Sequence, residues 1–284
     1  MLPFRKIIFP VDYSDACRAV APYVKHAVQH FSAQLTLIHS YGEEGLSFFD
    51  FPVSGAELAT RVREFEEARL SEFAADVFAG IHTERFAELG EAGTAIHEVL
   101  QRQGGDLIML PTHGRGPVRR MMLGSVTAKL LHDVSCAVWT STSSASAANT
   151  PEYRSIVCAV DDNPEALAVI KAGAALAKSY KADLAVVHVL GLPPMSMELD
   201  YAAIKNDLLQ AARGRLREAM ASVKVEAPHA VLEGNIASAL NDWAAERKAD
   251  LLITGRGRSL DGLGSVWSNL YSIVRESACP VISI

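Results

Sequence analysis

The chain has 284 residues, 49% of them apolar and 21% charged, and its length favours two domains over one. The formal charge of −6 excludes a general attraction to nucleic acid or to an anionic membrane surface. No apolar run approaches the roughly 20 residues that span a bilayer, and the apolar start of the chain is too short for a secretory signal. We therefore expect a cytoplasmic protein with no nucleic-acid or membrane partner. Its four cysteines form no C-x-x-C pair and are expected to be reduced thiols.

An internal repeat organises the chain. Residues 4–42 align without a gap on residues 153–191, at an offset of 149 (161 − 12). Further along, the offset falls to 144 (250 − 106) and then to 143 (279 − 136). Self-similarity at this length indicates two copies of one domain. The matched pairs are Asp12 and Asp161, His39 and His188, Asp106 and Asp250, and Cys136 and Cys279.

Strand and helix patterns alternate in the first copy. The apolar run Lys6–Val11 predicts a buried parallel strand, and Ser14 is a suitable N-cap for the helix that follows. Each later apolar run is separated from the next by a pattern of helical period. Further strands are expected at Gln34–His39, Thr83–Leu89, Leu107–Pro111 and Ala137–Thr140, with helices from about Ala56 to Phe78, around Ile96–Leu100 and after Gly124.

The second copy repeats this order. Asn163 is expected to cap its first helix, with Pro164 at the first helical position. Each copy thus reads β-α-β-α-β-α-β-α-β, which predicts an α/β fold of two repeated doubly wound domains, each a five-stranded parallel sheet flanked by helices. We expect domains at 1–142 and 153–284, joined by a small polar linker at 143–152. Strands are expected at Asp183–Val189, Ala227–Leu232, Leu251–Gly255 and Pro280–Ile284, with a long helix at about Asp200–Ser222.

The stretch Leu107–Thr127 carries the strongest functional signal. It reads as a buried strand, a glycine-broken loop with three arginines, and a Gly-Ser step into a helix. Backbone amides beside a helix N-terminus form a cradle for phosphate oxygens. Nine residues separate Gly114 from Gly124-Ser125, so the stretch resembles the G-x2-G-x9-G-[ST] signature of the universal stress protein family.

This resemblance implies an adenine nucleotide α-hydrolase-like fold that binds ATP, with or without Mg²⁺, in the crevice between the first and fourth strands. Pro111 replaces the first glycine of the motif and has no amide to donate, so one contact of the cradle is expected to be lost. His39 and His188 are expected to form structural hydrogen bonds. Carried over residue by residue, the expected nucleotide-binding residues are Pro10, Val11, Asp12, Ser40, Leu110, Pro111, His113, Gly114, Arg115, Gly124, Ser125, Val126 and Thr127.

The second copy departs further from the family pattern, and two alignments of its last loop are open. The preferred one places Trp267 on Gly124 and expects an indole to obstruct the phosphate end. The other uses Gly264-Ser265-Val266 and requires a last helix three residues longer. We expect a weak or empty second site, whose candidate residues are Val160, Asp161, Val189, Gly255, Gly257 and Ser268.

Two functions are compatible with these residues. The first is a stress-response regulatory protein that binds adenine nucleotide mainly in its first domain, with the two domains pairing inside the chain and a homodimer as a further assembly. No general base, nucleophile or metal cluster points to dedicated catalysis, so we expect at most slow ATP hydrolysis. The alternative is an interaction module that has lost nucleotide binding and acts through protein partners or another small ligand.

Overall fold

The computed structural model describes residues 4–42, 55–114, 123–141, 152–191, 201–257 and 265–284. These residues divide into two compact units, Pro3–Pro151 and Glu152–Ile284, which are described separately below. No helix among the described residues is long and apolar enough to cross a membrane.

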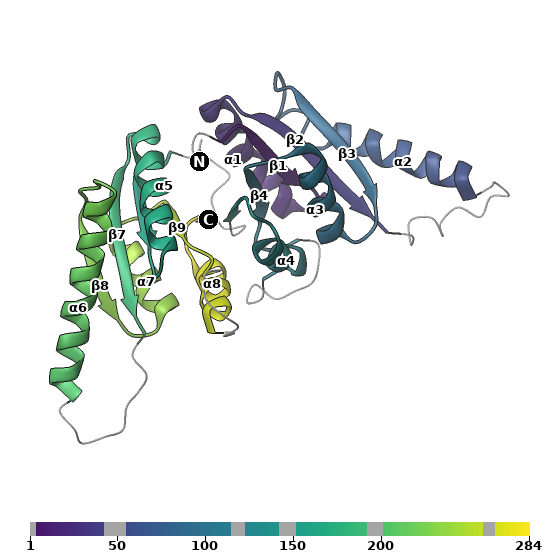
Figure 1. The fold of residues 1–284 in the computed structure, drawn as a ribbon. Helices are drawn as coiled ribbons and strands as arrows, with labels where there is room; N and C mark the ends of the chain where they lie inside the picture. The colour runs from purple at the N-terminus through teal and green to yellow at the C-terminus, as the bar shows by residue number, and fades with distance from the viewer. Residues whose placement is uncertain (1–3, 43–54, 115–122, 142–151, 192–200, 258–264) are drawn as a thin grey trace. The chain divides into compact units, whose positions relative to one another are not determined.

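The first unit alternates strands and helices along the chain (Figure 1). The buried runs that the sequence marks as strands form them, because a strand covered on both faces needs apolar side chains throughout. Its elements are β1 (Lys6–Pro10), α1 (Asp15–Phe31), β2 (Gln34–Tyr41), α2 (Gly55–Glu72), β3 (Thr83–Leu89), α3 (Ala92–Gln103), β4 (Leu107–Pro111), α4 (Ser125–Asp133) and β5 (Ala137–Ser141).

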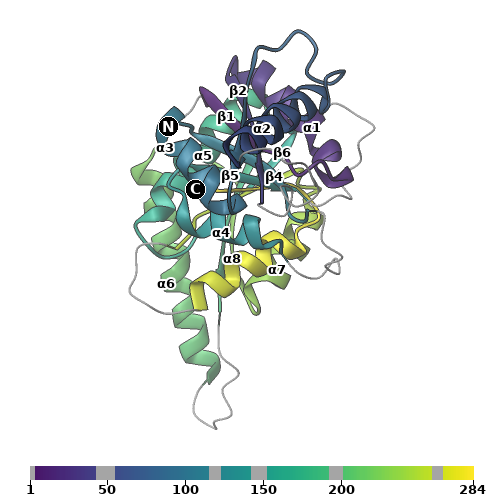
Figure 2. The ribbon, with the colours of Figure 1, turned by 90° about the vertical axis from the view of Figure 1, so that its right-hand side faces the viewer.

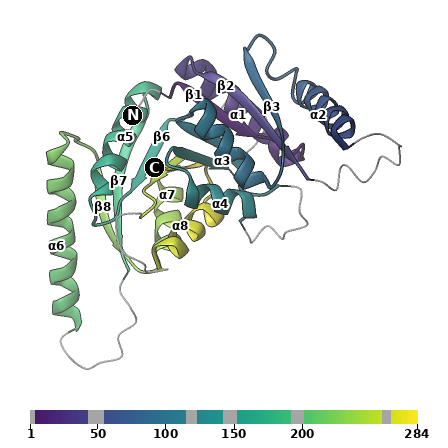
Figure 3. The same cartoon turned by 45° about the vertical axis from the view of Figure 1, so that its right-hand side comes forward.

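These strands form a parallel sheet in the order β3-β2-β1-β4-β5. The chain builds outward from β1 to β3, then returns to place β4 on the other side of β1. Helices α3 and α4 contact each other on one face of the sheet, and α1 lies on the opposite face (Figure 3). The order of the strands therefore reverses between β1 and β4, which is where open α/β sheets bind ligands.

The second unit repeats the architecture of the first. Its strand order, β8-β7-β6-β9-β10, is the same as that of the first unit, and the pairs are again parallel. Helices α7 and α8 contact each other, as α3 and α4 do (Figure 2). The expected fold class is thus confirmed for both copies. The elements are β6 (Ser155–Ala159), α5 (Glu165–Tyr180), β7 (Asp183–Leu190), α6 (Tyr201–Ser222), β8 (His229–Glu233), α7 (Ile236–Glu246), β9 (Leu251–Thr254), α8 (Ser265–Glu276) and β10 (Val281–Ser283).

The repeated Asp106 and Asp250 have the same structural role. Each carboxylate accepts two backbone N–H groups at the start of the central strand of its sheet. Asp106 accepts those of Arg5 and Lys6 at 2.8 and 3.1 Å. Asp250 does the same for Arg154 and Ser155, at 2.7 and 3.1 Å. These bonds satisfy backbone donors that the adjacent strand does not reach.

Several element boundaries differ from expectation, among them the end of β2, which reaches Tyr41, and the start of β8, which lies at His229. Helix α2 ends at Glu72 rather than near Phe78, because Ala74 adopts a left-handed φ of 50° and the following residues form turns. Phe73 and Phe78 continue the apolar pattern of the helix in the sequence, but they lie beyond its end and pack against Phe9 of β1.

Helix α5 begins at Glu165, one residue later than expected. Pro164 has helical dihedral angles, and the Asn163 side chain accepts the Glu165 N–H at 2.9 Å. The Asn-Pro pair therefore still marks the start of the helix, although the helix itself begins just after it.

Candidate functional site

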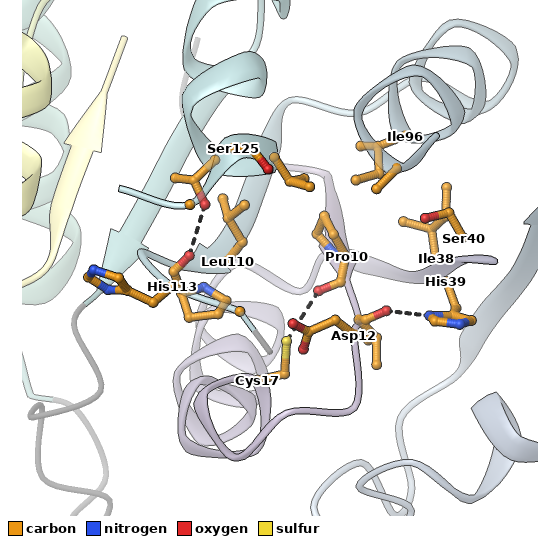
Figure 4. A pocket seen from close by; sticks show the side chains of 17 residues that line it. Pro10, Asp12, Cys17, Ile38, His39, Ser40, Ile96, Leu110, His113 and Ser125 are labelled. Atoms are coloured by element: carbon orange, nitrogen blue, oxygen red, sulfur yellow. Dashed lines mark hydrogen bonds between the residues drawn. The ribbon is translucent and has the colours of Figure 1, made fainter. Parts of the chain in front are cut away.

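A cavity of about 390 Å³ opens at the carboxyl ends of β1 and β4 (Figure 4). Figure 4 shows Ser125 of α4 on one side and Ile38, Ser40 and Ile96 on the other, so the cavity has a helix-terminus end and a more apolar end. A volume of this size is ordinary for a small-molecule site. The lining residues are Pro10, Val11, Asp12, Cys17, Ile38, His39, Ser40, Ala92, Ile96, Leu110, Pro111, His113, Gly114, Gly124, Ser125, Val126 and Thr127.

Every residue predicted for the first site lines this cavity except Arg115, which lies outside the described residues. The sequence reasoning did not include Cys17, Ile38, His39, Ala92 and Ile96 among the lining residues. One signal for Ile38 was available, because it lies two positions before Ser40 and strand alternation directs both side chains to one face. Helix α3 reaches the cavity only through tertiary packing.

The N-terminus of α4 is open toward the cavity. Its N-cap, Gly124, has no side chain, whereas α1, α3 and α7 are capped by the side chains of Ser14, Glu91 and Asn235. The N–H groups of the first helical residues, Ser125, Val126 and Thr127, have no carbonyl partner within the helix. An anion in the cavity would meet both these donors and the positive end of the helix dipole.

Helix α4 is joined to the end of β4 by two hydrogen bonds. The Gly124 N–H donates to the Thr112 carbonyl at 2.9 Å, and the Thr127 hydroxyl donates to the Pro111 carbonyl at 3.1 Å. The Thr127 hydroxyl proton is therefore used inside the protein, which leaves its backbone N–H as the donor toward the cavity. A Cβ at Gly124 would lie 3.3 Å from the Thr112 oxygen, so this close approach favours glycine.

Asp12 extends from the loop after β1 into the cavity, beside Cys17 (Figure 4). One carboxylate oxygen accepts the Ser14 N–H at 2.9 Å. The other lies where a Cβ on Gly114 would come within 2.4 Å of it, so glycine at position 114 leaves room for this carboxylate. Burial, and then the charge of Asp12, raise the pKa of the Cys17 thiol to about 12. Cys17 is therefore a protonated thiol at neutral pH, not a nucleophile.

The two matched histidines make the same hydrogen bond in both domains. His39 Nδ1 lies 2.7 Å from the Val11 carbonyl oxygen, and His188 Nδ1 lies 2.8 Å from that of Val160. Because a carbonyl only accepts, Nδ1 carries the proton in each ring. The expected structural role of both histidines is confirmed. The His113 ring is directed away from Asp12, and its Nδ1 lies 2.8 Å from the Thr112 hydroxyl (Figure 4).

The corresponding crevice of the second domain is smaller: one cavity of about 30 Å³ lies at the ends of β6 and β9, and another of about 70 Å³ lies beside Asp161 and His188. Two residues that line the smaller cavity have larger side chains than their counterparts in the first domain. Ile236 stands at the position of Ala92 (236 − 92 = 144), and Arg256 stands at that of Thr112 (256 − 112 = 144). Arg256 is 1% exposed and donates to Ser283 Oγ and to the Ser283 carbonyl oxygen. The predicted residues Val160, Asp161, Val189 and Gly255 line this small cavity.

Gly257, also predicted for the second site, does not line the cavity. Its N–H donates to Glu165 Oε2 at 2.8 Å, so a carboxylate of the protein already holds this amide. Ser268 lies within α8, and its side chain is outside the described residues, as is that of Trp267.

Helix α8 starts earlier than the preferred alignment of the second copy implies. Helix α8 has 12 residues and begins at Ser265, directly after Gly264, whereas α4 has nine. In the crevice, however, Asn269 and Leu270 stand where Val126 and Thr127 stand in the first domain, at the offset of 143 (269 − 126) that the preferred alignment uses, so the extra residues lengthen α8 at its N-terminus. The crevice therefore meets Asn269, Leu270 and Ile273 in the helix interior, where N–H groups bond to carbonyls four residues back. Among the described residues, the second crevice therefore meets no open helix N-terminus at this position.

Comparison with known proteins agrees with this geometry. The model of the universal stress protein family matches residues 3–141 and 152–284, so the chain belongs to that family and contains two copies of its domain. Universal stress protein MJ0531 of Methanocaldococcus jannaschii is 28% identical over 140 residues, which cover 48% of this chain and 80% of that protein.

Among solved structures, a universal stress protein from Archaeoglobus fulgidus covers 98% of this chain and 95% of its own, with 18% identity and a TM-score of 0.66. A functionally unknown protein, PA1789 of Pseudomonas aeruginosa, covers 99% and 92%, with 15% identity and a TM-score of 0.68. At these identities the structures support the shared tandem fold.

Proposed function

We propose that the first domain binds an adenine nucleotide in the crevice between β1 and β4, and that the protein acts as a stress-response regulator through this binding. The observation that carries the proposal is the uncapped N-terminus of α4 at one end of a 390 Å³ cavity. The amides of Ser125, Val126 and Thr127 would hold phosphate oxygens, and the more apolar end near Ile38 and Ile96 would receive the base.

ATP is the nucleotide that the family resemblance favours. When present, Mg²⁺ would neutralise phosphate charge, and Asp12 is the acidic residue among the described lining residues that could contribute to holding it. We propose binding without dedicated catalysis. The Cys17 thiol keeps its proton, and the His39 ring holds the Val11 carbonyl, so neither residue is arranged as a nucleophile and base pair.

For the second domain we propose a role that does not involve nucleotide, because its crevice is filled by Ile236 and Arg256. Packing of one domain against the other, or against a second chain, stays a prediction to be tested by sedimentation. The four cysteines are free thiols, which supports the expected cytoplasmic location.

Isothermal titration of the full chain with ATP, with and without Mg²⁺, tests the proposal. We expect a single nucleotide per chain, together with a rise in the stability of the first domain of about 2.7 kcal/mol at 100 times Kd. Calorimetric melting in the same buffers would show whether one domain alone is stabilised. No heat and no shift in melting at millimolar ATP would exclude nucleotide binding and favour the interaction-module alternative.

A further inference from the structure

Helix α2 places a carboxylate against the back of the first crevice. The Glu66 side chain is 12% exposed, and its Oε2 lies 3.5 Å from His39 Nε2. The same oxygen lies 3.5 Å from the Tyr13 hydroxyl and 3.6 Å from an Arg69 guanidinium nitrogen. Glu66 is thus the centre of a cluster with His39, Tyr13 and Arg69, which is called the Glu66 cluster below.

Tyr13 adopts a backbone conformation that needs such support. Its φ of 62° lies in the left-handed region, which costs a residue other than glycine roughly 1 kcal/mol or more. The Tyr13 ring lies 4.4 Å from the His39 ring and 5.8 Å from that of Phe73, between centroids, and the Arg69 guanidinium carbon lies 4.0 Å from the Tyr13 centroid. Contacts with α2 and the turn after it therefore hold Tyr13 in this strained conformation.

The Glu66 cluster controls both neighbours of Asp12. On one side, His39 donates from Nδ1 to the Val11 carbonyl (Figure 4). Its Nε2, which donates only in the protonated ring, lies 3.5 Å from Glu66 Oε2. On the other side, Glu66 and Arg69 hold Tyr13 directly. Asp12 lies between these two fixed residues and lines the cavity.

We infer that Glu66 is a positioning residue for the nucleotide site: it acts through His39 and Tyr13 to hold residues 11–13 in the conformation that binds ligand. This inference rests on the proposed function of the first crevice. Fixing a binding loop before the ligand arrives lowers the ordering cost of association, so the cluster raises affinity without touching the ligand.

The second domain supports the same loop in a different way. Asp162 stands at the position of Tyr13 (162 − 13 = 149) and pairs with Arg215 of α6 at 2.6 Å. Both side chains are about half exposed, so this ion pair contributes little to holding the loop in place. The small cavity beside His188 is lined from α6 by residues of which none is acidic: Ala212, Arg215, Leu216 and Ala219. Among these α6 residues there is thus no counterpart of the Glu66 carboxylate, which lies behind the open first crevice.

The test compares Glu66→Gln with Glu67→Gln, an identical change one residue along α2 at an exposed position. Two quantities are measured in the full chain: the Kd for ATP by titration, and amide hydrogen exchange of residues 11–14 without ATP. We expect Glu66→Gln to raise Kd about three- to tenfold and to speed exchange in this segment. Glu67→Gln should change neither quantity.

Separate outcomes overturn the inference and the proposed function. If Glu66→Gln binds ATP within twofold of the wild type, or leaves exchange at residues 11–14 unchanged, Glu66 does not position the loop. A lower melting temperature with unchanged Kd would mark a purely structural role and also overturn it. If the wild type binds no ATP at all, the proposed function fails, whereas faster exchange in Glu66→Gln would still show that the carboxylate holds the loop.

Discussion

The two crevices of this chain share one strand order and differ in what they can hold. The first contains a cavity of about 390 Å³, and the second contains two small cavities of about 30 and 70 Å³. Both crevices lie at sheets with the same strand order. In each, a matched histidine, His39 or His188, bonds to the carbonyl of the residue after the first strand. The fold therefore provides the place for a ligand, and a few local differences decide whether the place is open.

Two of these differences act on separate properties of the site. Ile236 and Arg256 line the small second cavity and are larger than Ala92 and Thr112, which stand at the same positions of the first domain. The earlier start of α8 removes the open amides, because the crevice then faces helix interior. Volume and anion recognition can therefore be changed one at a time, and each prediction below changes one of them.

Gly124→Asp should have the largest effect. An aspartate at the N-cap of α4 would accept the amides of its own helix and place a negative charge where phosphate is expected. We expect ATP affinity to fall by about 100-fold or more, because like-charge contacts cost several kcal/mol. Stability should fall by about 1 kcal/mol, because the new Cβ lies 3.3 Å from the Thr112 oxygen, although aspartate is a favourable N-cap. Titration and chemical denaturation measure the two quantities.

Asn235→Asp is the matched control, since it introduces the same carboxylate at a helix N-cap of the second domain. It should leave ATP binding unchanged. Wild-type affinity in Gly124→Asp would show that α4 does not hold the phosphates.

Ala92→Ile gives the first crevice the side chain of the second. It fills part of the cavity and leaves the α4 amides open, so we expect ATP affinity to fall about tenfold and stability to stay equal or rise. Ala92→Ser, which adds little volume, should bind ATP nearly as the wild type does. If both variants bind equally well, the ligand does not occupy the α3 side of the cavity.

The reverse change, Ile236→Ala with Arg256→Thr, gives the second crevice the side chains of the first. Removing the half-buried Ile236 should cost about 1–2 kcal/mol, and the double variant should be less stable still. We nevertheless expect one ATP per chain in titration, because α8 still presents helix interior to the crevice. A second bound ATP would show that volume alone closed this site.

Much of the fold could be predicted from the sequence because its determinants are local. The apolar runs, the Ser14 cap and the 149-residue offset identified the two copies and nearly all strands. The end of α2 could not be predicted, because Phe73 and Phe78 continue the apolar pattern and pack on Phe9 only in the folded chain. The earlier start of α8 could not be predicted either, because residue matching found the end of this helix but not its start.

The sequence by itself determined that this protein is a repeat of one α/β domain, and which residues of the first copy gather at the end of β1 and β4. Strand ends and helix caps are marked by residue type, so a motif reports them directly. Only the tertiary structure decided that Ile236 and Arg256 occupy the second crevice, that Glu165 holds the Gly257 amide, and that Glu66 lies behind the first crevice. These side chains act across the fold, on residues far away in sequence, and the space between them exists only once the sheet has formed.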